Sequence, residues 1–460
     1  MSGYRTVPEA TKYIPRGIPY IVGNEFAERF SFYGMQGILT IYMTRHLVDG
    51  AGNLDPMNEE QAKTVFHLFT AAVYAFPLAG SILSDVLLGK YRTILLLSLG
   101  YCVGHTFLAV GDTETGSLLF SPRGWFFLGL ACIACGAGGI KPCVSAHVGD
   151  QFGLRNQHLM SKVFGWFYFF INVGAALSNL VTPLLLEKVG PWLAFGLPGI
   201  LMVVATGVFW LGRHRFVHIP PAGVGGVWAT VRSPAGRRAL LNLLPIFLLF
   251  IPVFWAIFGQ TGSSWVLQAA HMDRQFLGVQ WYEAQIQVAN PILILLFIPL
   301  FSYVVYPLAG QFCQVTPLRK MSVGLVLAAA AFAISGWLEV RIESGEQPSI
   351  GWQLVAYMVL TAAEVLVSIT SLEFAYTQAP PAMKSVVMGI YFAGVALGNL
   401  LTSGINWMIQ RSAGASQLAG ANYYWFFTGL MTLAAVCFVL FTLFYRGNTF
   451  VQGSQRSGEQ

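Results

Sequence analysis

Residues 18–47 read IPYIVGNEFAERFSFYGMQGILTIYMTRHL, and this stretch indicates both the class of the protein and an anomaly within it. It is long enough to cross a bilayer as one helix, because about 20 apolar residues span the hydrocarbon core. It also carries Glu25, Glu28 and Arg29, although a charge in hydrocarbon costs at least ~2.5–3.5 kcal/mol. Glu25 and Arg29 are an i,i+4 pair, and Glu25 and Glu28 share a helix face. We therefore expect paired charges that face a watery cavity, as in a protein that moves something across a membrane.

The composition of the whole chain predicts an integral membrane protein. Hydrophobic residues make up 55%, charged residues 10%, and the mean hydropathy is +0.61, whereas soluble domains carry about 25% charged residues. Stretches that could cross a bilayer recur twelve times. They cover about 18–47, 64–88, 93–112, 124–147, 162–186, 193–212, 239–268, 283–306, 321–338, 351–378, 385–410 and 422–445.

The distribution of basic residues predicts the orientation. Most of the 26 lysines and arginines fall on the side that carries both termini, so that side is expected to be cytoplasmic. The pI of about 9.0 reflects this bias and not nucleic-acid binding. Twelve spans in two halves predict an all-α major facilitator fold with a substrate site between the halves. We expect a cytoplasmic N-terminus (1–17), bundles at 18–212 and 239–446, a linker (213–238) and a tail (447–460).

Other classes of function are disfavoured by what the apolar segments contain. The first dozen residues are polar and the first apolar segment is charged, so we expect no cleavable signal peptide. Cys132 and Cys135 have no histidine or cysteine partner at zinc spacing, and we interpret them as small side chains at helix contacts. The eight histidines form no catalytic or metal-binding pattern. The chain is therefore not expected to be an enzyme or to hold a metal or cofactor.

The end of the second apolar segment, residues 80–92, predicts a gating element on the cytoplasmic side. It reads GSILSDVLLGKYR and places Asp85 before a tight turn that holds Lys90 and Arg92. Such a cluster can lock neighbouring helices through charge and dipole contacts, and it resembles the loop motif that stabilises a gate in major facilitator proteins. A plain turn of the positive-inside kind is the alternative.

Four motifs in order along both halves resemble those of proton-coupled oligopeptide transporters. Residues 25–34 (EFAERFSFYG) resemble the family signature, and residues 138–152 resemble its fourth-helix motif. Residues 167–174 (FYFFINVG) and 372–380 (LEFAYTQAP) resemble its fifth- and tenth-helix motifs. The resemblance implies proton-driven symport of di- and tripeptides by alternating access, in the inner (plasma) membrane of a bacterium. Expected partners are peptides, protons as the coupling ion, and the lipid bilayer, with no nucleic acid and no obligate protein partner.

The resemblance implies a proton-coupling network of Glu25, Glu28, Arg29, Lys141, His67 and Glu373. Lys141 lies in an apolar segment, so a carboxylate partner is expected, and snorkelling to the inner surface is the alternative. Glu364 and Glu373 are nine residues apart on one expected helix, so they point half a turn apart. The resemblance selects Glu373 as the acid that takes the peptide's amino terminus, and for Glu364 the alternatives are pairing between helices or a protonated acid against a hydroxyl.

His67 is expected near the outer mouth, within the first turn of its helix. Imidazole titrates near ~6.5, which suits proton uptake from an acidic exterior, and residues 65–67 resemble the vertebrate members of the family. The alternative is an interfacial histidine that packs against Phe66 and Phe69.

The substrate cavity implied by the resemblance combines charged, aromatic and amide side chains. Aromatic rings with a polar handle accept varied side chains, and amides can bond a peptide backbone. The expected set is Arg29, Tyr33, Gln36, Tyr42, Tyr74, Lys141, Tyr168, Asn172, Trp255, Asn290, Glu373 and Trp407.

Two positions depart from the family pattern. Gln36 stands where an arginine usually clamps the peptide's carboxylate, and glutamine cannot form that bidentate charged pair. Gly259 stands where relatives often place an acid. Gln36 also favours the alternative function, a transporter of the same fold that carries nitrate or another small solute.

Overall fold

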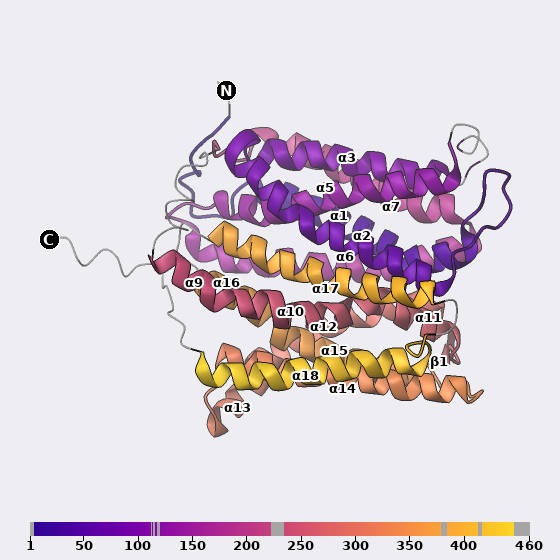
Figure 1. The fold of residues 1–460 in the computed structure, drawn as a ribbon. Coiled ribbons are helices and arrows are strands. Elements are labelled where there is room, and N and C mark those ends of the chain that lie inside the picture. Colours follow the sequence, from indigo (N-terminus) through magenta and orange to yellow (C-terminus); the bar gives the residue numbers. More distant parts are fainter. Residues whose placement is uncertain are drawn as a thin grey trace.

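The computed structural model describes residues 4–111, 113, 116, 120–221, 234–378, 384–412 and 416–445. The predicted tail, most of the predicted linker and the Ala379-Pro380 end of the tenth-helix motif lie outside these residues. Nearly every described element is a helix (Figure 1).

The N-terminal half consists of six long helices. Their ends follow from local sequence, because Asn58 and Ser121 accept hydrogen bonds at helix N-termini from the amides of Gln61 (2.8 Å) and Gly124 (3.1 Å), as N-cap residues do. The elements are α1 (Ile18–Ile41) with a π-helical turn (Tyr42–His46), α2 (Glu59–Ile82) with another (Leu83–Leu88), α3 (Lys90–Gly111), α5 (Pro122–Asp150), a 3₁₀ turn (Gln157–Leu159), α6 (Met160–Lys188), α7 (Pro191–Leu211) and a 3₁₀ turn (Gly212–His214).

The C-terminal half has more interrupted helices. Its elements are α9 (Pro234–Pro245), a π-helical turn (Ile246–Phe250), α10 (Ile251–Phe258), a 3₁₀ turn (Gly259–Gly262), α11 (Ser264–Ala270), strands β1 (Gln275–Phe276) and β2 (Val279–Gln280), a 3₁₀ turn (Glu283–Val288), α12 (Ala289–Leu300), a π-helical turn (Phe301–Val305), α13 (Tyr306–Phe312), α14 (Pro317–Glu343), α15 (Gly351–Glu364), a π-helical turn (Val365–Ile369), α16 (Thr370–Gln378), α17 (Lys384–Arg411) and α18 (Ala421–Phe444). The strands form a small antiparallel hairpin in which Phe276 pairs with Val279.

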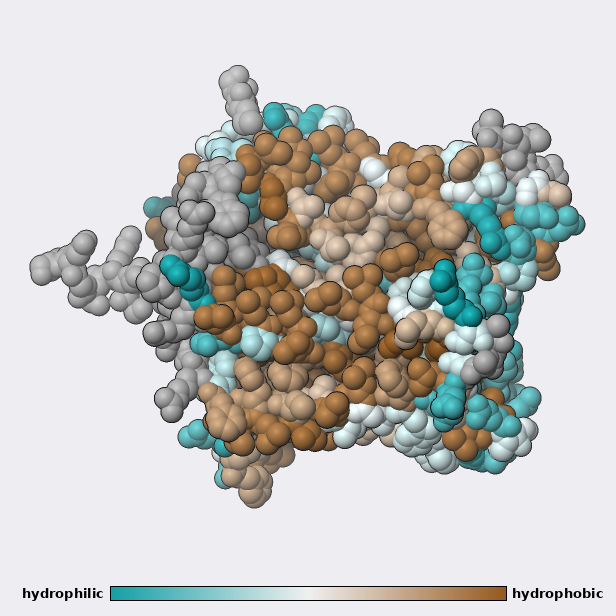
Figure 2. Space-filling view, in the orientation of Figure 1, coloured by the Kyte–Doolittle hydropathy of each residue, from teal (hydrophilic) through white to brown (hydrophobic). Residues whose placement is uncertain are grey.

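The described helices match the predicted spans closely. Eleven helical stretches are long and apolar enough to cross a membrane, and α1 has the required length but also carries the charged cluster. Figure 2 shows the corresponding surface, in which a broad hydrophobic region covers the middle of the helices and hydrophilic side chains gather at the ends. Together with α1 these stretches account for the twelve predicted spans.

The helices form two bundles that lie side by side, with both termini at the same end (Figure 1). One buried core is built mainly from residues of α1 to α7, and a second is built from residues of α9 to α18. Helix α17 of the second bundle packs along α2 of the first. The space between the bundles is therefore bordered by helices from both halves of the chain.

Polar contacts join the two bundles on the side away from the termini, which is the outer side. One of these contacts is an ion pair between Arg45 of the first bundle and Glu283 of the second. The hydrogen bonds run from Thr40 Oγ1 to Gly262 O (2.7 Å), from Ser403 Oγ to Thr64 O (3.0 Å), from Gln287 Nε2 to Gly37 O (2.9 Å), and from Gln285 Nε2 to Leu180 O (3.0 Å). The structure is therefore closed on its outer side.

Candidate functional site

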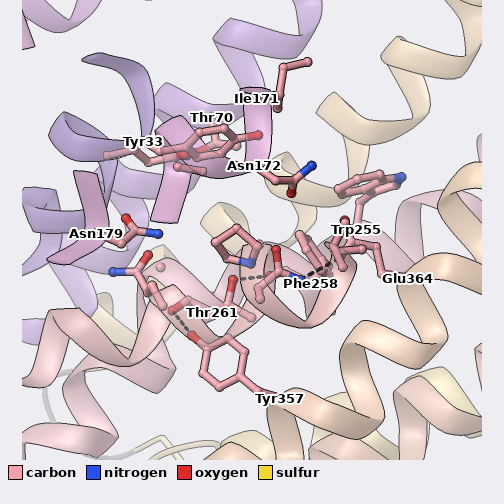
Figure 3. A pocket seen from close by; sticks show the side chains of 18 of the residues that line it. Tyr33, Thr70, Ile171, Asn172, Asn179, Trp255, Phe258, Thr261, Tyr357 and Glu364 are labelled. Atoms are coloured by element: carbon pink, nitrogen blue, oxygen red, sulfur yellow. Dashed lines mark hydrogen bonds between the residues drawn. The ribbon is translucent and has the colours of Figure 1, made fainter. Parts of the chain in front are cut away.

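A cavity of about 200 Å³ lies between the bundles (Figure 3). At roughly 30 Å³ per water molecule, it has room for a small solute. Its wall is aromatic and amide-rich, and both halves of the chain contribute to it. The polar and aromatic lining residues include Tyr33, Gln36, Thr70, Tyr74, Tyr168, Asn172 and Asn179 from the first bundle, and Trp255, Gln287, Asn290, Tyr357, Glu364 and Asn399 from the second.

Glu364 is the one charged side chain among the described residues that line this cavity. Asn290 Nδ2 donates to Glu364 Oε2 at 2.6 Å and lies 3.3 Å from Thr361 Oγ1. The π-helical turn of residues 365–369 follows directly, and such turns often occur at functional sites. The carboxylate is thus oriented by an amide from the neighbouring helix α12.

The structure does not place Glu373 in the cavity, so the prediction that selected Glu373 over Glu364 as the cavity acid is wrong. Glu373 lies on α16, beyond the π-helical turn, and its side chain is exposed. Nine residues at a rise of 1.5 Å put it about 13 Å further towards the cytoplasmic end. The sequence signal for Glu364 was an acid in an apolar segment, which the motif match outweighed.

The Glu25, Glu28 and Arg29 cluster is buried inside the first bundle. Arg29 Nε lies 2.8 Å from Glu25 Oε1 and 2.8 Å from Glu28 Oε2, and Glu28 is 0% exposed. Helix α6 approaches closely here, since a side chain at Gly174 would meet the Phe26 carbonyl oxygen at 2.8 Å. The predicted pairing of these charges is therefore present, and α6 covers it.

Lys141 contacts aromatic rings where a carboxylate was predicted. Its Nζ lies 4.1 Å from the ring centre of Tyr74 and 4.6 Å from that of Phe32, and it forms no ion pair with any described residue. An ammonium over an aromatic face is stabilised by the ring quadrupole. Helices α2 and α5 can approach closely because Gly138 has no side chain. A side chain there would meet the Val73 carbonyl oxygen at 2.4 Å.

Arg29 and Lys141 do not line the cavity, but each adjoins a residue that does. Tyr74 lines the cavity and holds Lys141 against its ring. Tyr33 also lines the cavity, and it follows Arg29 by one helical turn, so the two share a face of α1. Both cations are thus placed one side chain behind the cavity wall.

His67 joins the two bundles and is completely buried, with an exposed fraction of 0%. Its Nδ1 lies 2.9 Å from Asn399 Oδ1 and its Nε2 lies 2.9 Å from Ser263 Oγ. The prediction that His67 lies within the first turn of its helix is wrong, because α2 begins at Glu59 and His67 is in its third turn. The ring also meets Phe66 edge-on.

The tautomer of His67 follows from its neighbours. Asn399 Nδ2 donates to Val395 O at 3.0 Å, which turns its Oδ1 towards His67. A neutral imidazole with a proton on Nδ1 then donates to Asn399 and accepts from the Ser263 hydroxyl. Gly259 makes room for this arrangement, since a side chain there would meet Asn399 Oδ1 at 2.7 Å and His67 Cε1 at 3.3 Å. Where relatives often place an acid, this chain therefore has a glycine against which His67 and Asn399 pack closely.

Two more of the predicted cavity residues, besides Arg29, Lys141 and Glu373, do not line the cavity. Tyr42 is buried against the rings of Phe126 and Phe195, at centroid distances of 5.4 and 5.0 Å. Trp407 is 45% exposed and Arg411 stacks on its ring. An aromatic residue in an apolar segment can face the core, the lipid or the cavity, so residue type alone did not separate these positions.

The predicted gating residues all lie on the cytoplasmic side of the first bundle. Lys90 Nζ lies 2.6 Å from Asp150 Oδ2, which joins α3 to α5. Asp85 accepts a hydrogen bond from Ser84 Oγ at 3.1 Å, and Arg92 is exposed. In this conformation the Lys90 pair joins helices within one bundle.

Curated relatives are similar to most of this chain. "Peptide transporter family 1" of Drosophila melanogaster is 39% identical over 368 residues, which cover 72% of this chain and 48% of that protein. "Solute carrier family 15 member 2" of Homo sapiens is 35% identical over 399 residues, which cover 77% of this chain and 53% of that protein. The chain therefore spans about half the length of the curated relatives it matches.

Solved structures match nearly the whole chain. The crystal structure of an auto-inhibited POT family peptide transporter has 34% identity and a TM-score of 0.84, and it covers 95% of this chain and 99% of that one. The POT family transporter PepTSo has 36% identity and a TM-score of 0.82, with coverage of 94% and 98%. The predicted all-α fold of two six-helix bundles is confirmed.

A sequence profile of the POT family matches residues 91–226 and 223–426, which is well over half of the chain. The motifs at residues 25–34 and 138–152, the two bundles and the cavity between them agree with that match. The chain belongs to the POT family.

Proposed function

We propose that this protein is a proton-driven symporter that imports di- and tripeptides by alternating access between its two bundles. Membership of the POT family supports the proposal, since several of the relatives are named peptide transporters. A cavity bordered by both bundles supports alternating access, because rocking of one bundle against the other would expose it to each side in turn. We place the protein in the inner membrane of a bacterium.

The observation that carries the proposal is the carboxylate of Glu364, which is the one charged group among the described residues of the cavity wall. A free peptide brings an ammonium group at one end, and an ammonium–carboxylate pair is a strong charge-assisted hydrogen bond. Asn290 holds the carboxylate from one side at 2.6 Å and leaves its other oxygen for the ligand. A lone negative charge disfavours nitrate and other anions as cargo.

The peptide's carboxylate end is assigned to the first bundle. Lys141 lies behind Tyr74 and Arg29 lies near Tyr33, so a rotation of either ring would bring a cation to the cavity. Gln36 lines the cavity and its Nε2 lies 3.2 Å from Thr70 Oγ1. It can therefore donate one neutral hydrogen bond to the carboxylate, in place of the bidentate charged pair of an arginine.

Proton coupling is assigned to the buried cluster on α1. Protonation of Glu25 or Glu28 would remove one of the two negative charges that hold Arg29. The freed positive charge would then stabilise the peptide carboxylate, so that proton and peptide favour each other's binding. One unit of pH gradient supplies ~1.4 kcal/mol per proton, and the membrane potential adds ~2.3 kcal/mol per charge per 100 mV.

The outer gate is assigned to His67 with Asn399 and Ser263. The neutral ring is satisfied by one acceptor and one donor, whereas an imidazolium has two N–H groups and requires two acceptors. Ser263 would then have to turn its hydroxyl hydrogen away. Protonation of His67 would thus change a contact that closes the outer side.

The proposal is tested in liposomes that contain the purified protein, with an imposed inward proton gradient and labelled dialanine. We expect dialanine to accumulate above its external concentration and a protonophore to abolish this accumulation. Uptake that only equilibrates, or that is indifferent to the protonophore, would exclude symport. Labelled nitrate in the same liposomes tests the alternative cargo, and we expect no accumulation of it.

A further inference from the structure

A second cavity, of about 210 Å³, lies at the cytoplasmic end of the first bundle, well away from the transport cavity. Its walls come from the N-terminal segment (Tyr4 and Thr6), the residues just before α3 together with its first three residues (88–92), the end of α5 (His147) and the segment that follows α7 (residues 217–221). Four separate parts of the sequence thus enclose it.

Hydrogen bonds between backbone groups and from the Gln151 side chain to the backbone fix these walls in place. The His218 amide donates to Arg5 O at 2.8 Å, which ties the N-terminal segment to the segment after α7. The Val217 amide donates to Gln151 Oε1 at 2.9 Å, and Gln151 Nε2 donates to His147 O at 3.0 Å. The cavity is therefore a built feature of the fold.

His147 contributes a buried nitrogen that has no hydrogen-bond partner in the part of the chain that the structure describes. The residue is 1% exposed and lines the cavity, and its Nε2 makes no hydrogen bond with any described residue. The rings of Phe209 and Phe216 pack against the imidazole, at centroid distances of 5.8 and 5.1 Å. A buried polar group without a hydrogen bond costs ~1–3 kcal/mol, so a bound group that accepts from this nitrogen would recover that cost.

The charges around the cavity favour an anion. Arg92 lines it, is exposed, and forms no ion pair within the described part of the chain, whereas Lys90 is paired with Asp150. Helix α3 begins at Lys90 and runs for 22 residues, so its first amides and its dipole also attract negative charge. Gly89 precedes the helix with φ at +77°. A side chain added at Gly89 would lie 3.4 Å from Ile219 O.

We propose that this cavity binds a phosphate group, held by Arg92, the Nε2 of His147 and the N-terminal amides of α3. The wall also includes the apolar side chains of Leu88, Ile219 and Pro220, and the neighbouring Leu87 is 66% exposed. Apolar side chains beside a phosphate site at the cytoplasmic end of a membrane helix fit a phospholipid, and anionic lipids attract basic clusters of this kind. The source is therefore assigned to the headgroup of an anionic phospholipid and not to a soluble phosphate. The site does not depend on the transport proposal and is tested by binding alone.

The test measures phosphatidylglycerol binding to the purified, delipidated protein by native mass spectrometry. Arg92→Gln removes the free charge, and His147→Phe removes the unpaired nitrogen while it keeps a ring against Phe209. The matched control is Arg155→Gln, because Arg155 is also an exposed cytoplasmic arginine but does not line the cavity. Loss of one charge-assisted hydrogen bond is expected to weaken binding roughly tenfold or more.

Both cavity variants should bind phosphatidylglycerol at least about tenfold more weakly, with Arg155→Gln unchanged. A second arm measures thermal unfolding in inorganic phosphate and in chloride at equal ionic strength. Protection by inorganic phosphate that needs Arg92, without binding of the lipid, would overturn the lipid assignment. Lipid binding that is equal in wild type and Arg92→Gln would overturn the site, and since Arg92 is exposed this variant is expected to fold even if His147→Phe does not.

Discussion

The role assigned to Glu364 predicts a large and specific effect of the substitution Glu364→Gln. The glutamine keeps the size of the side chain, and its oxygen can still accept from Asn290, which lies 2.6 Å from Glu364 Oε2. What is lost is the charge that pairs with the peptide's ammonium. Hydrogen bonds to charged groups contribute ~1.5–3 kcal/mol, so dialanine should bind about 10- to 150-fold more weakly.

Glu373→Gln is the matched control for this prediction. It makes the same chemical change on the continuation of the same helix, but its side chain is exposed and does not line the cavity. Isothermal titration of each variant with dialanine and with N-acetyl-dialanine measures the effect. We expect Glu373→Gln to bind dialanine as the wild type does, and Glu364→Gln to lose its preference for the free amino group. A weakening by Glu373→Gln, or equal losses for both ligands in Glu364→Gln, would refute the assignment.

Three further predictions follow from the cluster, the gate and the cavity wall. Glu25→Gln should abolish gradient-driven uptake and spare dialanine exchange in liposomes, whereas loss of both would give the cluster a purely structural role. His67→Phe removes two 2.9 Å contacts between the bundles, so spin-label distances across the outer side should lengthen. His46→Phe, which alters a contact within one bundle, should leave them unchanged. Gln36→Arg should tighten binding of dialanine more than of dialanine amide. An equal effect on both ligands would show that residue 36 does not recognise the carboxylate.

The membrane-spanning helices could be predicted from sequence. The free-energy cost of exposing apolar surface to water, or of placing a charge in lipid, depends on the residues of each segment alone. The stretch at 18–47 was predicted as one long span, and α1 with its π-helical turn covers 18–46. The Glu25 to Arg29 pair could also be predicted, because residues four apart on a helix are neighbours whatever surrounds them.

The parts of the site that depend on packing between helices could not be predicted in this way. Lys141 needed a partner, but the choice of Tyr74 over a carboxylate depends on how closely α2 approaches α5. Hydropathy placed the start of the helix that carries His67 later than the structure does, so His67 was expected at the surface. Its partners Asn399 and Ser263 are distant in sequence, and a single sequence carries no signal that joins them.

Glu364 and Glu373 show that a local sequence motif does not determine how deep in the membrane a residue lies. The motif around Glu373 matched the family, yet the cavity lies about two and a half helical turns nearer the outer side, where Glu364 lies. A polar residue within a long apolar run was the available physical signal, and it applies equally to Asn399 and Gln287, which also line the cavity.

The coupling of peptide to proton movement is tested most directly by recording the internal pH of liposomes that contain the protein. No proton gradient is imposed, and dialanine is added outside while the membrane potential is clamped at zero. The account predicts that the interior acidifies as dialanine enters, that N-acetyl-dialanine causes little change, and that Glu25→Gln abolishes the signal. Entry of labelled dialanine into wild-type liposomes without any acidification would contradict it.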